Sequence, residues 1–197
     1  MIYTTAMLRD KYANYANQLA KIKWETDRGN LIRLNRGLYE SDPHVEPCLL
    51  ASCLLSPSYL SFDFALSYYG LIPERVFSIT SASFGQRKHK TYVNHFGRFE
   101  YEDIPQEAFS EGLTYLKRGD VWVKIATKEK AICDSLYHWP VVRSQKELKE
   151  LLFEDKRIDP EEFFSCNKQE MIRLASLYHK TNLSLLLRFV EKEDFHE

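Results

Sequence analysis

The chain of 197 residues is long enough for one large domain, or for a small module joined to a core of ordinary size. Apolar residues make up 44% and charged residues 28%, which is typical of a soluble globular protein. The formal net charge of −1 excludes a polycation, so contact with nucleic acid must come from basic residues that cluster locally.

The basic residues gather in the first 39 positions. Seven lysines and arginines stand there against three carboxylates, whereas acidic residues are concentrated later in the chain. The basic set is Arg9, Lys11, Lys21, Lys23, Arg28, Arg33 and Arg36, and the acidic set is Asp10, Glu25 and Asp27.

Two helices and a short hairpin are predicted in this region. Residues 4–11 form a brief first helix, and residues 14–28 form a second one that ends before Gly29, a residue suited to the left-handed position after a helix. Residues 31–34 and 38–40 read as strands around the turn at 35–37. Four side chains of the second helix recur at helical spacing and are expected to face inward: Tyr15, Leu19, Ile22 and Thr26.

Residues 41–47 (SDPHVEP) are a linker by composition, with two prolines and no periodic pattern. They divide the chain into a module at 1–40 and a domain at 41–197. Helices are predicted at 48–55 and at 61–69, the second one capped by Ser61. Strands follow at 75–81, 90–95, 98–104, 112–117 and 121–126, and a further helix over 127–138 begins at Thr127.

The region 140–197 is predicted to be helical. Its helix starts are marked by the capping box of Ser144 with Glu147, by Asp159 before Pro160, and by Asn167. The last helix, 181–191, is apolar on too many sides for a surface helix, so we expect it to be packed deep or pressed against a partner. The predicted fold class is α+β, with a short winged helix-turn-helix, a mixed domain with a mostly antiparallel sheet, and a helical tail.

The cysteines and the hydropathy pattern predict a soluble cytoplasmic protein without membrane contact. Cys48, Cys53, Cys133 and Cys166 have no framework spacing, so reduced and buried thiols are expected. The N-terminal stretch carries Arg9, Asp10 and Lys11 and no long apolar run, so no signal peptide is predicted. The longest uncharged run, 47–62, is too short to span a bilayer.

Four phrases of the sequence occur in an order that resembles a known family. They are LIRLNRGLYE in the hairpin, YLSFDFALSYYGLI at 59–72, FEYEDI at 99–104 and KIATKEKAICDSLY at 124–137. Over residues 12–139 the chain resembles the AbiEi family of antitoxins, predicted transcriptional regulators of abortive-infection (viral defence) toxin–antitoxin systems of type IV.

The resemblance implies an N-terminal winged helix that binds double-stranded operator DNA, followed by a mixed α/β antitoxin domain. It also implies an operon whose second gene encodes a nucleotidyltransferase-like toxin. The chain departs from the family in one respect, because only one brief helix precedes the long one where a full winged helix has two. We therefore expect Tyr15, Leu19 and Ile22 to pack on the following domain and complete the module.

The chemistry of the second helix and the hairpin suits DNA. Amide side chains match adenine, arginine and lysine match guanine, and cations neutralise phosphates. The alternative is a solvated helix with ordinary surface charges. The predicted DNA-binding residues are Asn14, Asn17, Gln18, Lys21 and Arg28 on the helix, with Arg33, Asn35 and Arg36 on the hairpin.

A second basic cluster is predicted in a loop, where Arg87, Lys88 and Lys90 are joined across the next turn by Arg98. This cluster could contact the toxin, RNA or a second stretch of DNA backbone, or it could be a plain exposed loop.

Other chemistries fit the sequence poorly. A metal-dependent nuclease could be sought among Lys128, Glu129, Lys130 and Asp134, but the acids and lysines lack the required spacing, and pairing of Lys130 with Asp134 along a helix explains them better. The Cys48/Cys53 and His89/His95 spacings are too loose for zinc.

We predict no enzyme activity, metal or cofactor. The sequence thus predicts an antitoxin and transcriptional autoregulator that binds operator DNA, at an inverted repeat if it is a homodimer. The alternative is an interaction module that docks a partner through its C-terminal helices and the 87–90 loop.

Overall fold

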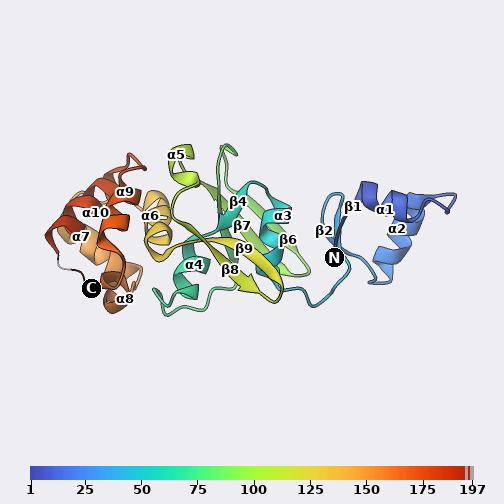
Figure 1. Cartoon of the computed structure of the whole chain (residues 1–197), viewed down its shortest axis with the longest axis horizontal. Coiled ribbons are helices and arrows are strands. Elements are labelled where there is room, and N and C mark those ends of the chain that lie inside the picture. Colours follow the sequence, from blue (N-terminus) through green and yellow to red (C-terminus); the bar gives the residue numbers. More distant parts are fainter. Residues whose placement is uncertain (194, 196–197) are drawn as a thin grey trace.

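The computed structural model describes residues 1–193 and 195. It is an α+β protein with a three-stranded antiparallel sheet near the N-terminus, a six-stranded mixed sheet and a helical C-terminal region, which confirms the predicted class. These three parts follow one another along the longest axis of the molecule (Figure 1).

The N-terminal sheet has the strand order β1–β3–β2, and both pairings are antiparallel. Strand β1 precedes the first helix and was not predicted, because three residues are too few to show alternation. The elements of this unit are β1 (Ile2–Thr4), α1 (Thr5–Lys11), α2 (Gln18–Asp27), β2 (Ile32–Asn35) and β3 (Leu38–Glu40).

The larger sheet has the order β6–β7–β5–β4–β9–β8. Its pairs β6/β7, β4/β5 and β8/β9 are antiparallel, whereas β5/β7 and β4/β9 are parallel, so the sheet is mixed. The strands are β4 (Ser58–Leu60), β5 (Ile79–Ser83), β6 (Lys90–Asn94), β7 (Gly97–Asp103), β8 (Leu113–Arg118) and β9 (Val121–Ala126).

Helices accompany this sheet and form the C-terminal region. The first set is the 3-10 helix η1 (Pro47–Leu50), α3 (Ala51–Leu54), α4 (Phe62–Tyr68), α5 (Gln106–Phe109) and α6 (Lys128–His138). The C-terminal set is α7 (Gln145–Lys149), the π-helix η2 (Glu150–Asp155), α8 (Pro160–Phe164), α9 (Lys168–Ala175) and α10 (Thr181–Lys192).

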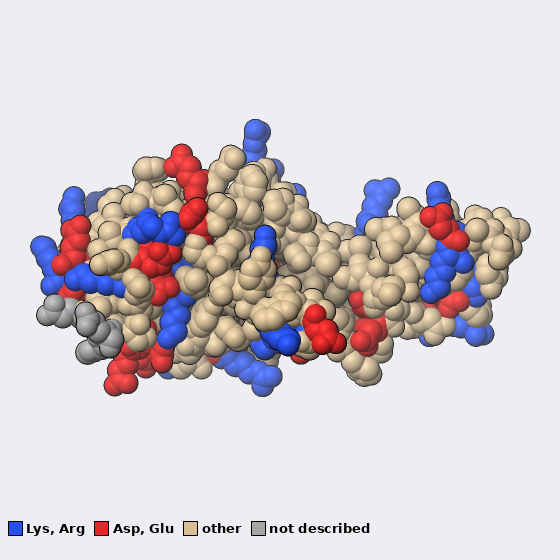
Figure 2. All heavy atoms as spheres, viewed as in Figure 1, with Lys and Arg blue, Asp and Glu red and all other residues tan. Residues whose placement is uncertain are grey.

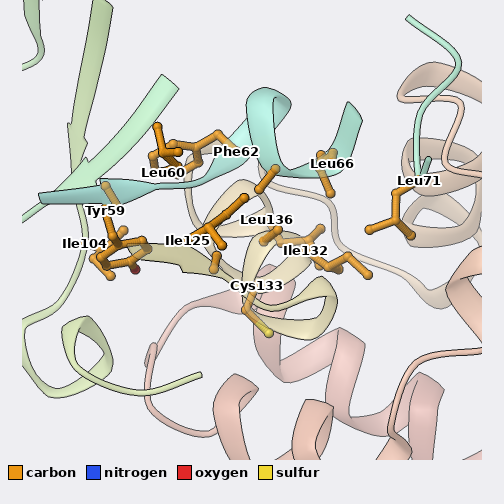
Figure 3. Close-up of a cluster of buried hydrophobic side chains, with 14 of the residues drawn as sticks. Tyr59, Leu60, Phe62, Leu66, Leu71, Ile104, Ile125, Ile132, Cys133 and Leu136 are labelled. Atoms are coloured by element: carbon orange, nitrogen blue, oxygen red, sulfur yellow. The ribbon is translucent and has the colours of Figure 1, made fainter. Parts of the chain in front are cut away.

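The main core lies where the middle strands meet α4 and α6. Leu60 of β4 and Ile125 of β9 are adjacent in the sheet, and the side chains of Leu66, Ile132 and Leu136 converge on them from the two helices (Figure 3). All five side chains are buried. Helix α6 is therefore fixed firmly, and it becomes the support for the C-terminal helices.

The predicted helix caps of the second half are confirmed. Each capping side chain accepts a hydrogen bond from the backbone N–H three residues later, and the caps are Thr127, Ser144, Asp159 and Asn167. Ser61 is different, because it makes no side-chain cap and its hydroxyl donates to Asp134 Oδ2 at 2.6 Å. Ser61 thus stands at the predicted N-cap position of α4, but its side chain does not make the expected capping hydrogen bond.

Some elements of the sheet region differ from prediction. The strand expected at 75–81 begins later, at Ile79, and neither β4 nor α5 was predicted. Strand β4 has three residues and is buried on both faces, so it lacks the alternation by which a strand is recognised in a sequence.

The apolar side chains of α10 are buried within the chain itself. Leu183, Leu186 and Phe189 belong to the main core, and they pack among residues of the other C-terminal helices. The expectation of deep packing is confirmed. The burial of these side chains argues against the alternative in which this helix presents an apolar face to a partner.

The predictions for the cysteines are confirmed in part. All four thiols are free, but only three are buried, because Cys53 is exposed, against prediction. Within the described residues, no helix combines the length and the apolar character that crossing a bilayer requires. On the face shown in Figure 2, cationic and anionic side chains are interspersed along the whole molecule.

Candidate nucleic-acid interface

The N-terminal unit has a small core of its own. Leu8 of α1, Ile22 of α2 and Leu31 before β2 are buried against one another, with the rings of Tyr3, Tyr12 and Tyr39 packed around them. This cluster is what holds α2 beside the hairpin.

The two units are joined by the three-stranded sheet and not by α2. Ile2, Leu34 and Leu38 contribute to the main core, and the Asn94 side-chain amide of β6 donates to the Leu34 carbonyl at 3.1 Å. Because Leu34 lies inside the hairpin, the hairpin is anchored to the larger sheet.

The inward face predicted for the second helix is wrong in two of its positions. Tyr15 is 48% exposed and Leu19 is 52% exposed, and only Ile22 of the three apolar residues is buried. The helix begins at Gln18, so Tyr15 lies in the preceding turn, where its ring meets that of Tyr12 edge-on at 5.9 Å. None of these side chains reaches the larger domain, so the module is not completed in the way expected.

The later start of the helix also moves Asn14 and Asn17 out of it. Asn17 is the N-cap, and its side-chain oxygen accepts from the Ala20 N–H at 3.0 Å. This side chain satisfies a backbone donor that would otherwise be unpaired. Its amide group stays available as a donor, and Asn14 lies exposed in the turn before it.

On α2, Lys21, Trp24 and Arg28 form a compact cluster. The Lys21 ammonium is 3.7 Å and the Arg28 guanidinium 3.9 Å from the centre of the Trp24 ring. Lys21 is also paired with Glu25 at 2.7 Å. Their hydrogen bond raises the pKa of Lys21 and lowers the pKa of Glu25, so both stay charged and partly offset each other. Arg28 is therefore the stronger candidate for a phosphate or guanine contact.

The hairpin presents two arginines. Arg33 and Arg36 are exposed, and its turn is shaped by Asn35, whose side-chain oxygen accepts from the Arg36 N–H at 2.7 Å. Gly37 has a φ of +78° and its carbonyl accepts from the Thr5 N–H at 2.9 Å. Among the described residues, the ion pairs of this unit are Lys21–Glu25 and the amino terminus with Glu40, so both arginines are unpaired.

The second predicted basic cluster is divided in the structure. Arg87, Lys88 and Lys90 lie together at one end of β6, but Arg98 pairs with Val93 nearer the other end, about 10 Å along the strand. Arg98 is bound to Glu100 at 2.7 Å. The four residues therefore do not form one cationic surface.

The residues considered for a nuclease hold the fold together. Lys130 and Asp134 are both wholly buried and 2.9 Å apart, as their helical spacing predicted. Asp134 accepts three further hydrogen bonds, from Tyr59 at 2.9 Å, Ser61 at 2.6 Å and Tyr178 at 2.5 Å. Burial, reinforced by the Asp134 carboxylate, raises the pKa of both tyrosines well above the ordinary value, so they remain neutral donors.

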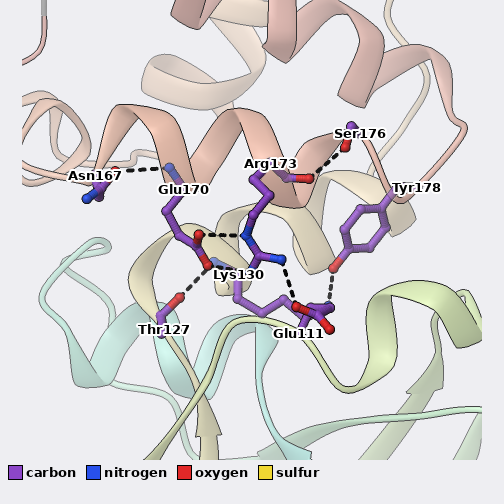
Figure 4. A network of polar contacts seen from close by, with 8 residues as sticks. All are labelled: Glu111, Thr127, Lys130, Asn167, Glu170, Arg173, Ser176 and Tyr178. Atoms are coloured by element: carbon purple, nitrogen blue, oxygen red, sulfur yellow. Dashed lines mark hydrogen bonds and ion pairs between the residues drawn. The ribbon is translucent and has the colours of Figure 1, made fainter.

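Figure 4 shows Lys130 and Tyr178 of this buried site together with polar residues of α9. Lys130 contacts the Tyr178 hydroxyl, and Thr127 caps the same helix. Nearby, Arg173 bridges Glu111 and Glu170 at 2.7 Å each. Tyr59, Ser61 and Tyr178 could not be recognised as partners of Asp134 beforehand, because they are distant in the chain.

No protein-family model matches this chain, and no curated protein matches it. Within residues 1–193 and 195, no three His, Cys, Asp or Glu side chains are grouped as a metal would require.

Proposed function

We propose that the protein is a transcriptional autoregulator and antitoxin of the AbiEi kind that binds operator DNA through α2 and the β2–β3 hairpin. The order β1–α1–α2–β2–β3 with sheet order β1–β3–β2 supports this proposal, because it corresponds to a winged helix from its first strand onward. In that arrangement α2 is the recognition helix and the hairpin is the wing.

The observation that carries the proposal is the pair of exposed arginines on the wing. Arg33 and Arg36 have no carboxylate partner within the described chain, and both lie on the hairpin that follows α2. Unpaired, exposed guanidinium groups on a rigid hairpin suit phosphates or a narrow minor groove. Gln18 and Arg28 lie on the adjacent helix, where they would reach base edges.

The test is binding of a labelled duplex that spans the region upstream of the gene, followed by fluorescence anisotropy at several salt concentrations. The double variant Arg33→Ala/Arg36→Ala is expected to reduce the slope of log K against log salt by about 1.8, since each lost phosphate contact removes roughly 0.9. The matched control is Arg143→Ala/Arg188→Ala, which removes two exposed arginines from the C-terminal region.

The control should bind like the unmodified protein. If both double variants lose the same affinity and slope, the effect comes from net charge and the wing assignment is wrong. If neither variant changes binding, the interface lies elsewhere.

The antitoxin role follows from the resemblance, which implies a nucleotidyltransferase-like toxin as the partner gene product. It is tested by expressing that toxin from the neighbouring gene with and without this chain. Restored growth is the expected result, and growth arrest in the presence of a well-expressed chain would refute the role. Repeating the assay with Arg33→Ala/Arg36→Ala separates protection through operator occupancy from protection through direct contact.

A further inference from the structure

The β8–β9 hairpin at the edge of the larger sheet exposes an alternation of aromatic and cationic side chains. Tyr115 lies directly opposite Lys124, and Lys117 lies directly opposite Trp122. Residues two apart on one strand, and residues opposite one another on paired strands, share a face. All four side chains therefore lie on one face, where Tyr115 is 59% and Trp122 60% exposed.

A cavity of about 420 Å³ adjoins this face. Tyr115, Trp122 and Lys124 of the hairpin line it together with Tyr59 of β4 and Phe109 of α5. Ser52, Ser56, Ser58 and Ser110 also line it. None of the described lining residues is acidic, and Lys124 is the one cation among them. A cavity of this size accommodates a small planar group such as a nucleobase.

The charges of the hairpin favour an anionic ligand. Among the described residues, the hairpin forms one ion pair, which joins Arg118 to Glu46. Lys117 and Lys124 therefore have no carboxylate partner in that part of the chain. The Lys117 ammonium lies 5.6 Å from the centre of the Trp122 ring. Lysine is depleted in protein–protein interfaces, whereas lysines alternating with exposed aromatic rings are what a groove for single strands uses.

We propose that this face binds single-stranded nucleic acid. Bases stack on Trp122 and Tyr115, one base enters the adjoining cavity, and Lys117 and Lys124 neutralise the phosphates between them. The site is separate from the duplex interface proposed on the N-terminal unit, and it does not depend on that interface being correct.

The experiment measures binding of fluorescein-labelled 12-mers of thymidine and of uridine to the full chain at low salt. Trp122→Ala is expected to weaken binding roughly 5- to 150-fold, which is the range for removing one stacked base. Trp122→Phe should recover most of the affinity because a ring is restored. The matched control is Phe77→Ala, which removes an aromatic side chain that is 86% exposed elsewhere on the surface.

Comparison of the two labelled strands shows whether the ligand is RNA or single-stranded DNA. Tighter binding of the uridine strand identifies RNA as the source, and tighter binding of the thymidine strand identifies single-stranded DNA. Absence of binding to both, or equal effects of Trp122→Ala and Phe77→Ala, overturns the proposal. Displacement of the strand by an equal concentration of a mononucleotide would also overturn it, in favour of a pocket for free nucleotides. Binding that persists in Arg33→Ala/Arg36→Ala separates this site from the wing.

Discussion

Replacing Lys130 with methionine leaves the Asp134 carboxylate buried without its cation. The two groups are 2.9 Å apart and fully shielded from water, and methionine has a length and volume close to the lysine side chain. The hydroxyls of Tyr59, Ser61 and Tyr178 still donate to the carboxylate, but they cannot cancel its charge. Removal of one partner of such a pair typically destabilises a protein by about 3–5 kcal/mol.

The predicted loss is measured as the free energy of unfolding in urea, followed by far-ultraviolet circular dichroism at pH 7. For a chain of this size each kcal/mol corresponds to roughly 2–4 °C, so the melting temperature should fall by roughly 6–20 °C. Lys146→Met is the matched control, because Lys146 forms an ion pair of the same spacing with Glu150 at 3.7 Å, and its side chain is 87% exposed. The control should change stability by less than about 0.5 kcal/mol.

Equal stability of the two variants would refute this reasoning. It would mean that Asp134 takes up a proton or is reached by water at little cost, and that the pair does not anchor α6.

Three further changes test other parts of the structure. The hydrogen bonds of Arg173 lower the pKa of Glu170, so this carboxylate stabilises the fold above pH 4.5 and loses that contribution as the pH falls through its lowered pKa. In urea titrations Glu170→Gln should cost under about 1 kcal/mol at pH 7, and this cost should shrink as the pH falls below 4.5. Gly37→Ala should cost more stability than Gly119→Ala, because both have a left-handed φ but only the Gly37 site is crowded; equal costs in thermal melts would contradict this. Asn17→Asp should keep the helix cap but weaken duplex binding, whereas Asn17→Ala should also lose about 1 kcal/mol of stability. Normal duplex binding by Asn17→Asp would show that Asn17 is not part of the interface.

The features that the sequence predicted well are those decided locally. The caps at Thr127, Ser144, Asp159 and Asn167 need only the residue itself and the N–H three positions later. The inward orientation of Leu19 was predicted wrongly because it depends on where the helix begins and on what lies opposite. Asn17 decides the start, and the small core has room for Ile22 but does not extend to Leu19.

Features that depend on distant residues could not be predicted. The spacing of Lys130 and Asp134 shows that they can pair, but their burial depends on Tyr59 and Tyr178, which come from other segments. The aromatic and cationic alternation on the β8–β9 hairpin is visible in the sequence as YLKRGDVWVK, and the register is needed to place those side chains on one face.

The position of Leu34 connects DNA binding with the stability of the main domain. This residue lies between the wing arginines and the main core, and its carbonyl is bound by Asn94 of the larger sheet. The hairpin has a second attachment, because Tyr39 of β3 packs on the small cluster around Ile22 that also holds α2. If the proposed interface is correct, loosening the contacts of Leu34 with the larger sheet removes one of the two anchors that position the wing beside the recognition helix. Asn94→Ala should then weaken duplex binding without lowering the helical content measured by circular dichroism. If the wing is independent of the larger sheet, the variant should bind the duplex as the unmodified protein does.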